Sequence, residues 1–362
     1  MLNLKGFPIS EEIEGARQGN YPLILAPSTS SICNFRCKPC FTNAGPKQEG
    51  EVGLTEHEQA IRQSAKLGAR YMHIAMNGEP WLDPAFYGKE KYPMVEIANE
   101  CGVYTVTFTN SSLITRENAE VAKAMGLSVV GKLWSFECFL DDYLIGSTHS
   151  RFDLSETGMS LRQSTSSDET KCGKTKIRCY QPRVEYDGKF IPEGLAILMD
   201  AGFNEVEDSR TRLGIDIIVT SANFRGIPEI AEWALEHDIY PVIDTMVPMG
   251  RAIDNVDLVM NPQQNKWLFQ ELSSVLGEDF VIGQFVEGCA IREVGLAYDN
   301  FGNTRVCCAL ASQVGNIKEK SIEELYAGIQ GHRRQLATYE KKEGTINMCD
   351  ISKLVKTIME LD

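Results

Sequence analysis

Short apolar segments alternate with helical segments along most of the chain, and this alternation restricts the possible folds more than any other feature. Six segments rich in β-branched or aromatic residues predict strands, over residues 23–26, 71–76, 103–107, 129–134, 215–220 and 240–245. Strands that are separated by helices run parallel and are joined by right-handed crossovers. We therefore predict an α/β fold in which six βα units form one parallel sheet.

Start and stop signals predict the helices between these strands. Thr and Pro are favoured at helix starts, and Gly often follows the last turn. The predicted helices cover residues 56–66 after Thr55, 94–100 after Pro93, 116–125 after Thr115, 190–201, and 229–236 after Pro228, with ends at Gly102, Gly126 and Gly202. Six such units are typical of a partial (β/α)6 TIM-like barrel.

Three cysteines follow the first predicted strand with the spacing C-x3-C-x2-C, namely Cys33, Cys37 and Cys40. This spacing predicts three thiolates around one point. Three are one ligand short of a closed zinc site or a fully protein-ligated iron–sulfur cluster, so one metal position stays open to a reactant. Zinc is the weaker alternative, because structural zinc sites favour C-x2-C pairs and no partner pair lies nearby.

At these cysteines the sequence resembles the radical SAM superfamily. In that family the C-x3-C-x2-C loop after the first strand holds a [4Fe-4S] cluster, whose fourth iron binds S-adenosylmethionine. After the second strand, Asn77, Gly78, Glu79 and Pro80 resemble the family's Gly-Gly-Glu-Pro segment, which contacts the amino group of S-adenosylmethionine. Asn77 departs from the family's first glycine but tolerates left-handed backbone conformations.

Later strand ends carry weaker matches to the family. Ser135 and Glu137 end the fourth strand, where the family often hydrogen-bonds the ribose of S-adenosylmethionine, and Thr109 ends the third. Arg212 resembles an arginine that pairs with the methionine carboxylate in several subfamilies. Ordinary polar strand ends are the open alternative for these residues.

The adenine contact is implied by two further residues. Gly250 belongs to a segment after the sixth strand that resembles the one whose backbone meets the adenine. Pro39 replaces the family's usual aromatic residue before the last cysteine, and Phe41 could supply the adenine-facing ring instead.

A second cysteine motif lies downstream. Residues 289–307 fit C-x12-G-x4-C, with a hairpin turn predicted over 299–303. The motif resembles the opening of the SPASM and twitch extensions, which implies one auxiliary [4Fe-4S] cluster held by Cys289, Cys307 and Cys349. The fourth ligand stays open between Cys308, a distant cysteine, substrate and solvent. Cys308 is otherwise a packing residue, or a catalytic residue that donates a hydrogen atom to a substrate radical.

The resemblance divides the chain into three parts. We expect an N-terminal segment over 1–20, the barrel over 21–255, and a twitch/SPASM-like auxiliary cluster domain over 256–362. A long insertion over about 139–188, which contains Cys172 and Cys179, lacks clear periodicity. Long loops of this kind often cover binding sites, so we expect a mobile cover over the barrel mouth.

Composition excludes several classes of partner. The formal net charge of -14 argues against nucleic acid, since phosphate binding needs clustered Lys and Arg. No segment approaches the length of a membrane span. The 11 cysteines are an odd number and no apolar signal sequence precedes them, so we expect a reduced, cytoplasmic protein.

The resemblance implies an enzyme that cleaves S-adenosylmethionine reductively and abstracts a hydrogen atom with the 5'-deoxyadenosyl radical, using electrons from a flavodoxin or ferredoxin-type reductant. Only 32 residues precede Cys33, too few for the peptide-recognition domain of many peptide-modifying relatives. We therefore expect a small-molecule substrate, sugar-like or aminocyclitol-like. A peptide-modifying enzyme is the first alternative, and a non-enzymatic iron–sulfur electron carrier or sensor is the second.

Overall fold

The computed structural model describes residues 2–75, 77–146, 181–285, 289–306 and 313–343, with the side chains of 282–285 and 335–343 left out. It also describes four short strands in two antiparallel pairs, β6 Phe152–Asp153 with β7 Ser160–Leu161 and β8 Lys171–Cys172 with β9 Thr175–Lys176.

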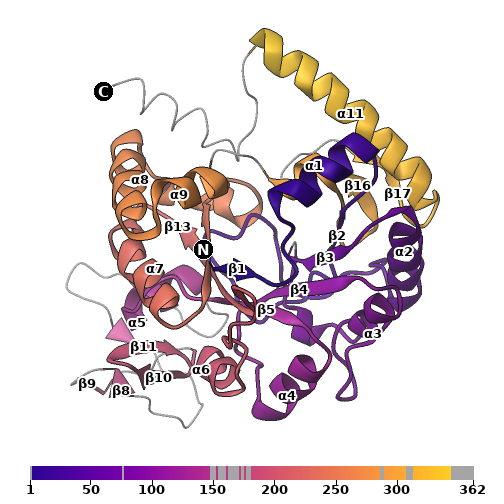
Figure 1. Cartoon of the computed structure of the whole chain (residues 1–362). Helices are drawn as coiled ribbons and strands as arrows, with labels where there is room; N and C mark the ends of the chain where they lie inside the picture. Colours follow the sequence, from indigo (N-terminus) through magenta and orange to yellow (C-terminus); the bar gives the residue numbers. More distant parts are fainter. Residues whose placement is uncertain are drawn as a thin grey trace.

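One open sheet of nine strands organises the chain, in the order β14-β13-β5-β4-β3-β2-β15-β16-β17 (Figure 1). The strands are β2 Ile24–Pro27, β3 Tyr71–Ile74, β4 Tyr104–Thr109, β5 Ser128–Lys132, β13 Leu213–Val219, β14 Tyr240–Thr245, β15 Gly295–Tyr298, β16 Asn303–Arg305 and β17 Gln313–Asn316. All six predicted strands are present and pair in parallel from β2 to β14. The prediction of a partial parallel barrel is therefore confirmed.

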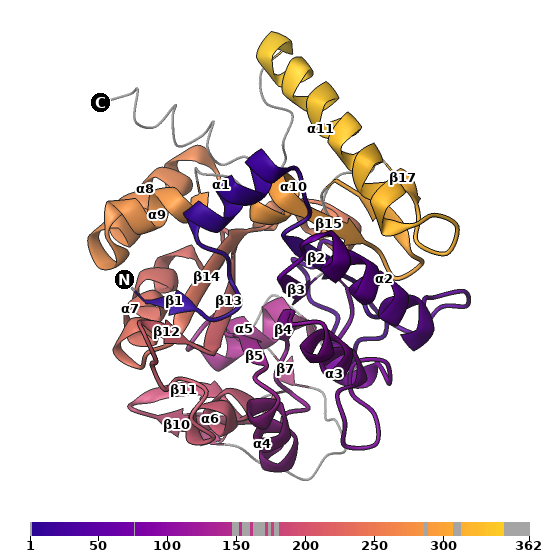
Figure 2. The same ribbon diagram turned by 45° about the vertical axis from the view of Figure 1, so that its right-hand side comes forward.

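Helices cover the outer face of this sheet, as Figure 1 and Figure 2 show. The crossover helices are α2 Leu54–Leu67, α3 Pro93–Glu100, α4 Arg116–Ala124, α6 Glu193–Asp200 and α7 Ile227–Glu236. The start of α4 is a capping box in which the Thr115 hydroxyl accepts from the Asn118 amide at 3.3 Å. α2 begins two residues earlier than Thr55 suggested, because the Glu56 carboxylate caps the Gly53 amide at 3.0 Å.

The N-terminal segment covers the end of the barrel at which the parallel strands begin. β1 Asn3–Leu4 pairs with β12 Arg210–Thr211, and α1 Ser10–Gly19 follows. The His73 Nε2 atom lies 2.9 Å from the Gly6 carbonyl, and the Phe7 ring lies 5.0 Å from the His73 ring. His73 is therefore a buried core residue, as its position within a predicted strand indicated.

Side chains alternate between the two faces of the barrel strands. Odd-numbered positions of β13, such as Ile215 and Ile217, pack against the outer helices. An inner cluster instead joins Val106, Val130 and Val242 to Leu4 of the N-terminal segment. Even-numbered positions of β5, β13 and β14 therefore face the inside of the barrel.

After β14 the chain crosses to the other edge of the sheet. The connection contains η3 Gly250–Leu258, α8 Pro262–Leu276, α9 Glu278–Phe285 and α10 Ala290–Val294. β15 then pairs with β2 as a further parallel strand, and the predicted hairpin to β16 is confirmed, with the Asp299 amide 3.0 Å from the Asn303 carbonyl. The final helix α11 Ile322–Glu343 packs against α2 and β17 (Figure 2).

The two ends of the insertion are more regular than the sequence suggested. α5 Cys138–Ile145 follows β5, and β10 Arg183–Tyr186 forms a hairpin with β11 Lys189–Pro192, so residues 190–192 are strand rather than the predicted start of a helix. Arg183 and Asp141 form a buried ion pair between these elements. Most of the insertion, with Cys179, lies outside the described residues. Among the described residues, no helix is long and apolar enough to cross a membrane.

Candidate functional site

The three cysteines lie on the loop between β2 and α2, at the edge of the sheet where the parallel strands end. The loop is closed at its base, because the Cys33 amide donates to the Gly45 carbonyl at 2.8 Å and the Gly45 amide donates to the Ser31 carbonyl at 2.7 Å. Cys37 is buried, and Cys33 and Cys40 are half-buried beside the same apolar cluster, which includes Phe35 and Trp134.

Two neighbouring elements hold this loop in place. The C-terminal carbonyls of α5 accept from the loop, with Lys38 N 2.8 Å from Leu144 O. On the other side, the Arg251 guanidinium donates to the carbonyls of Ala44 at 2.6 Å and Cys37 at 3.3 Å. The cysteine loop is thus fixed by the ends of two different βα units.

Lys132, at the end of β5, places a positive charge beside the three thiols. Burial raises the pKa of Cys37 to about 12, an effect that Lys132 partly opposes. Burial and the nearby Glu79 also raise the pKa of Cys33. Burial alone would lower the pKa of Lys132, but Cys37, Asp216 and the other two cysteines together raise it. Lys132 therefore favours negative charge at the cysteine loop.

The geometry suits an iron–sulfur cluster better than a single ion. Within the described ranges, no three His, Cys, Asp or Glu side chains are arranged around a single metal-ion position. Ligands of a [4Fe-4S] cluster bind separate iron atoms and need not converge. Cys33, Cys37 and Cys40, on one anchored loop with an apolar surround and a facing Lys132, fit such a cluster.

The loop after β3 lies directly against the cysteine loop. The Glu79 amide donates to the Ile32 carbonyl at 2.7 Å. Gly78 has a φ of 73°, and a Cβ atom there would lie 2.2 Å from the Ser30 carbonyl oxygen. Only glycine therefore permits this contact, which explains the residue that the sequence resemblance singled out. Pro80, buried, starts the short helix η1 Pro80–Leu82.

Glu79 links the loop after β3 to the end of β4. Its carboxylate accepts from the Thr109 hydroxyl at 2.7 Å and from the Asn110 amide at 2.8 Å. Burial raises the pKa of Glu79, and the bonds from Asn110 and Thr109 counteract that shift. The structure thus brings together two residues, Glu79 and Thr109, that the sequence analysis named separately.

Phe41 and Gly250 also meet at this edge. Gly250 has a φ of 53°, and a Cβ atom there would lie 2.6 Å from the Phe41 carbonyl group. The Ala252 amide donates to the Cys40 carbonyl at 3.0 Å. The end of the sixth βα unit is therefore stacked on the cysteine loop.

Ser135 and Glu137 follow β5 at the same edge of the sheet as the cysteine loop, next to Trp134 of the apolar cluster, whereas Arg212 does not. Ser135 is buried, and its hydroxyl accepts from the amide of Glu137, whose side chain is exposed at the start of α5. The expectation for Arg212 is wrong, because a residue just before a parallel strand lies at the opposite edge of the sheet. Its guanidinium donates there to the Lys123 carbonyl at 2.8 Å.

The second cysteine motif is only partly described. Cys289 is exposed at the start of α10. Cys307, Cys308 and Cys349 lie outside the described residues.

Two groups of residues near the site were not predicted from the sequence. Asn300, in the β15–β16 turn, accepts from Asn77 at 3.1 Å and donates to Glu51 at 3.0 Å. Asp216 and Asp244 lie on the inner face of β13 and β14. Charged residues within apolar strands were the available signal for this second group.

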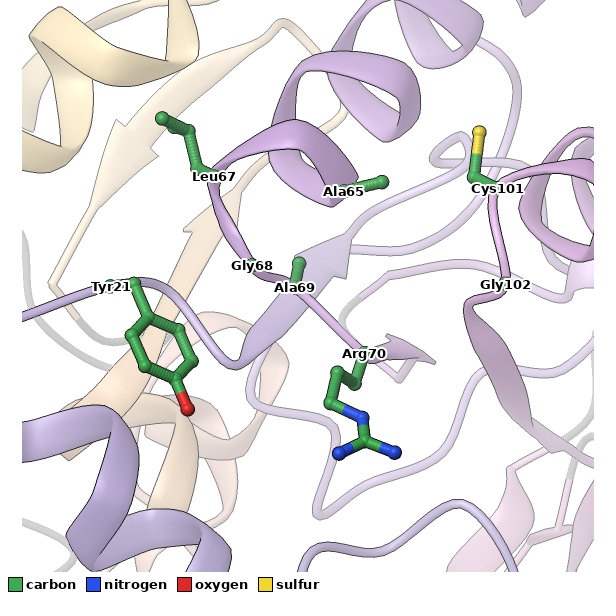
Figure 3. Close-up of a pocket in the computed structure, with 8 residues that line it drawn as sticks. All are labelled: Tyr21, Ala65, Leu67, Gly68, Ala69, Arg70, Cys101 and Gly102. Carbon is green, nitrogen blue, oxygen red and sulfur yellow. The ribbon is translucent and has the colours of Figure 1, made fainter. Parts of the chain in front are cut away.

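A surface pocket lies away from these residues. It is lined by Tyr21, Ala65, Leu67, Gly68, Ala69, Arg70, Cys101 and Gly102 (Figure 3). Arg70 and Gly102 precede β3 and β4, so the pocket is at the opposite edge of the sheet from the cysteine loop. It is not part of the candidate site.

The fold with this cysteine loop defines the class: a partial barrel of the type found in radical SAM enzymes that carry SPASM or twitch extensions. The structure of anSMEcpe with bound AdoMet matches 94% of this chain and 96% of that chain, with a TM-score of 0.59 and 15% identity. Streptococcus suis SuiB bound to precursor peptide SuiA matches 89% of this chain and 70% of that chain, with a TM-score of 0.57 and 13% identity. At these identities the likeness shows a shared fold.

Sequence comparison adds one curated relative. Fe-coproporphyrin III synthase of Methanosarcina barkeri is 32% identical over 100 residues, which are 27% of this chain and 24% of that protein. The matched segment thus spans about a quarter of the relative's length. No protein-family model matches the sequence.

Proposed function

We propose that this chain is a radical SAM enzyme in which Cys33, Cys37 and Cys40 hold a [4Fe-4S] cluster that binds S-adenosylmethionine. When bound, the reduced cluster supplies the electron that splits the sulfonium into methionine and a 5'-deoxyadenosyl radical. The observation that carries the proposal is the contact between the cysteine loop and the Gly78–Glu79 loop, at 2.7 Å from Glu79 N to Ile32 O. This contact brings the two strongest sequence motifs together.

The chain's own residues position S-adenosylmethionine in this proposal. Because the Glu79 carboxylate is occupied by Thr109 and Asn110, it fixes the loop, and we propose that backbone carbonyls of the loop receive the amino group. The backbone stack of Gly250 on Phe41 supplies the adenine contact. The apolar cluster around Cys37 limits water near the reacting bond.

The substrate is proposed to be a small molecule that is sugar-like or aminocyclitol-like. The inside of the barrel supports this proposal, since it holds charged side chains within a mostly apolar wall, as small-molecule sites do. A peptide substrate is the second candidate. It is favoured by SuiB, whose structure contains a precursor peptide, and by anSMEcpe, for which peptide-bound structures exist.

An auxiliary [4Fe-4S] cluster at Cys289, Cys307 and Cys349 completes the proposal. Support comes from the hairpin, because β15 and β16 pair antiparallel, with Arg305 opposite Ala297 and Thr304 opposite Tyr298. The chain before β15 and the chain after β16 therefore leave the hairpin at the same end. Cys308 is proposed as a neighbouring thiol that packs or donates a hydrogen atom, and a flavodoxin or ferredoxin-type protein as the reductant.

Electron paramagnetic resonance of the reduced, reconstituted protein tests the cluster assignment. We expect a [4Fe-4S] signal that changes when S-adenosylmethionine is added, because the ligand binds the cluster directly. Cys37→Ala should remove this response, whereas Cys101→Ala, at the opposite edge of the sheet, should keep it. A response that survives in Cys37→Ala would refute the assignment.

A further inference from the structure

Two carboxylates inside the barrel have no role in holding the cysteine loop or the Gly78–Glu79 loop. Asp216 pairs in register with Lys132 on one side and Val242 on the other, and Val242 belongs to the inner cluster. Asp244 lies two residues further along β14 and pairs with Ile218, which packs against the apolar cluster that contains Cys37. Asp244 is therefore at the level of the cysteine loop, and Asp216 lies one layer below.

These carboxylates are not neutralised by the protein. Asp216 is 6% exposed, and within the described part of the chain its carboxylate accepts no hydrogen bond and forms no ion pair. Lys132 acts on Asp216 electrostatically but lies beyond ion-pair distance. Among the described residues, the Asp244 carboxylate likewise accepts no hydrogen bond and forms no ion pair, but its side chain is exposed to solvent. For Asp216, burial of a carboxylate without a hydrogen-bonding partner costs free energy, and such exceptions are expected at functional sites.

The charge inside the barrel favours a cation. Among the described residues on the inner face of β5, β13 and β14, Asp216 and Asp244 outnumber the one ammonium, that of Lys132, which also faces the cysteine thiols. Desolvation by the protein atoms around Asp244 raises its pKa to about 6 although the side chain keeps contact with solvent, and repulsion from Asp216 adds to the shift. A bound cation would relieve both the desolvation and the repulsion.

We propose that Asp216 and Asp244 bind an ammonium group of the substrate inside the barrel, so that the substrate is an amine such as an aminosugar. This inference rests on the proposed function, because it assumes that the inside of the barrel receives the substrate. The pair of carboxylates would hold the amine at the level of the cysteine loop. A neutral hydroxyl in the same place would leave the charge uncompensated.

Binding of matched probes tests the proposal. Glucosamine and glucose are titrated by calorimetry into the reconstituted protein with S-adenosylmethionine present, near neutral pH. We expect glucosamine to bind at least about tenfold more tightly, as one charge-assisted hydrogen bond is worth roughly 1.5–3 kcal/mol. Asp216→Asn and Asp244→Asn should each abolish this preference, so that glucosamine and glucose bind with about equal affinity. Asp200→Asn, an exposed carboxylate on α6, should leave it unchanged.

The ammonium group could instead belong to a lysine of a peptide substrate. Titrations with acetyllysine amide and its neutral counterpart, acetylnorleucine amide, distinguish a peptide from an aminosugar. A preference for the lysine probe that Asp244→Asn removes supports the ammonium site and assigns it to a peptide substrate. Equal binding within both probe pairs, no detectable amine binding, or a preference that survives both Asn variants would overturn the proposal. Weaker binding of S-adenosylmethionine in the variants, with an unchanged amine preference, would also overturn it.

Two controls separate this inference from folding and from the proposed function. Asp244→Asn removes a carboxylate that is repelled by Asp216, so its melting temperature should match or exceed that of the parent protein. A marked fall would show a structural role and overturn the inference. Formation of 5'-deoxyadenosine without an amine preference would refute the inference alone, whereas an amine preference without 5'-deoxyadenosine would refute the proposed function.

Discussion

The Asn77 side chain donates a hydrogen bond to the Asn300 side chain at 3.1 Å, and this bond joins the loop after β3 to the β15–β16 turn. Asn300 in turn donates to Glu51, which accepts from the Ser31 amide at 3.0 Å at the base of the cysteine loop. Asn77 is the position at which the chain departs from the Gly-Gly-Glu-Pro pattern. The side chain that replaces the first glycine of the pattern thus links the loop after β3 to the β15–β16 hairpin.

A double-mutant cycle of Asn77→Ala and Asn300→Ala measures this connection. We expect a coupling of about 0.5–1.5 kcal/mol in the free energy of unfolding, the usual value of one hydrogen bond. Asn300→Ala should also weaken S-adenosylmethionine binding, because it loosens the neighbouring loop. Additive effects of the two substitutions in urea unfolding would show that the bond contributes nothing.

Gly78→Ala should abolish S-adenosylmethionine binding. The new methyl group would meet the carbonyl oxygens of Ser30 at 2.2 Å and Ile32 at 2.7 Å, so the two loops must separate. Gly102→Ala is the matched control, since its φ of 69° is also positive but no atom lies within 4 Å of the added Cβ. The control should lose only about 1–2 kcal/mol of stability through backbone strain. Similar ligand affinities in both variants, measured by calorimetry, would argue against the close contact.

His73 should make the apo-protein less stable in acid. Burial lowers its pKa from 6.5 to about 4 in the folded chain. Between these values the unfolded chain binds a proton that the folded chain does not, so stability is full above pH 6.5 and falls as the pH decreases. The loss approaches roughly 3 kcal/mol near the folded pKa.

His73→Gln keeps a donor for the Gly6 carbonyl but removes the titrating group. Urea unfolding at a series of pH values should therefore show a flatter curve for the variant than for the parent protein. His57, whose burial lowers its pKa to about 4 as well, contributes equally to both curves. Parallel curves would contradict this account of His73.

The auxiliary cluster predicts a specific iron content. Joint replacement of Cys289, Cys307 and Cys349 by Ala should lower iron from about eight to about four atoms per chain after reconstitution. Cleavage of S-adenosylmethionine should remain detectable, because the first cluster is untouched. An unchanged iron content in the triple variant would refute the second cluster.

The sequence predicted the barrel well because its strands are buried on both faces. Residues such as Ile217 and Ile218, which pack on opposite faces of β13, give the strand an apolar character that stands out from the helices. Helix starts were harder to predict where a side chain from the first turn of the helix caps it, as Glu56 does for α2. β15 was predicted as a hairpin strand, but its pairing with β2 depends on a long connection that local patterns do not encode.

The site was predictable where a motif lies on one loop and less so where it is assembled from several strands. The Gly78–Glu79 loop and the cysteine loop were found from short segments. The contact of Glu79 with Thr109 spans two βα units, and Asp216 and Asp244 come together only through strand register. Arg212 precedes β13, and the start of a parallel strand lies at the edge of the sheet opposite the cysteine loop, where its guanidinium donates to the Lys123 carbonyl.

Formation of 5'-deoxyadenosine tests the central claim most directly. The protein is reconstituted anaerobically with iron and sulfide, reduced with dithionite and given S-adenosylmethionine. The account predicts 5'-deoxyadenosine and methionine in equal amounts from the parent protein, and neither from Cys33→Ala, Cys37→Ala or Cys40→Ala. Unchanged cleavage in these variants, or no cleavage by parent protein that carries its full iron content, would contradict it.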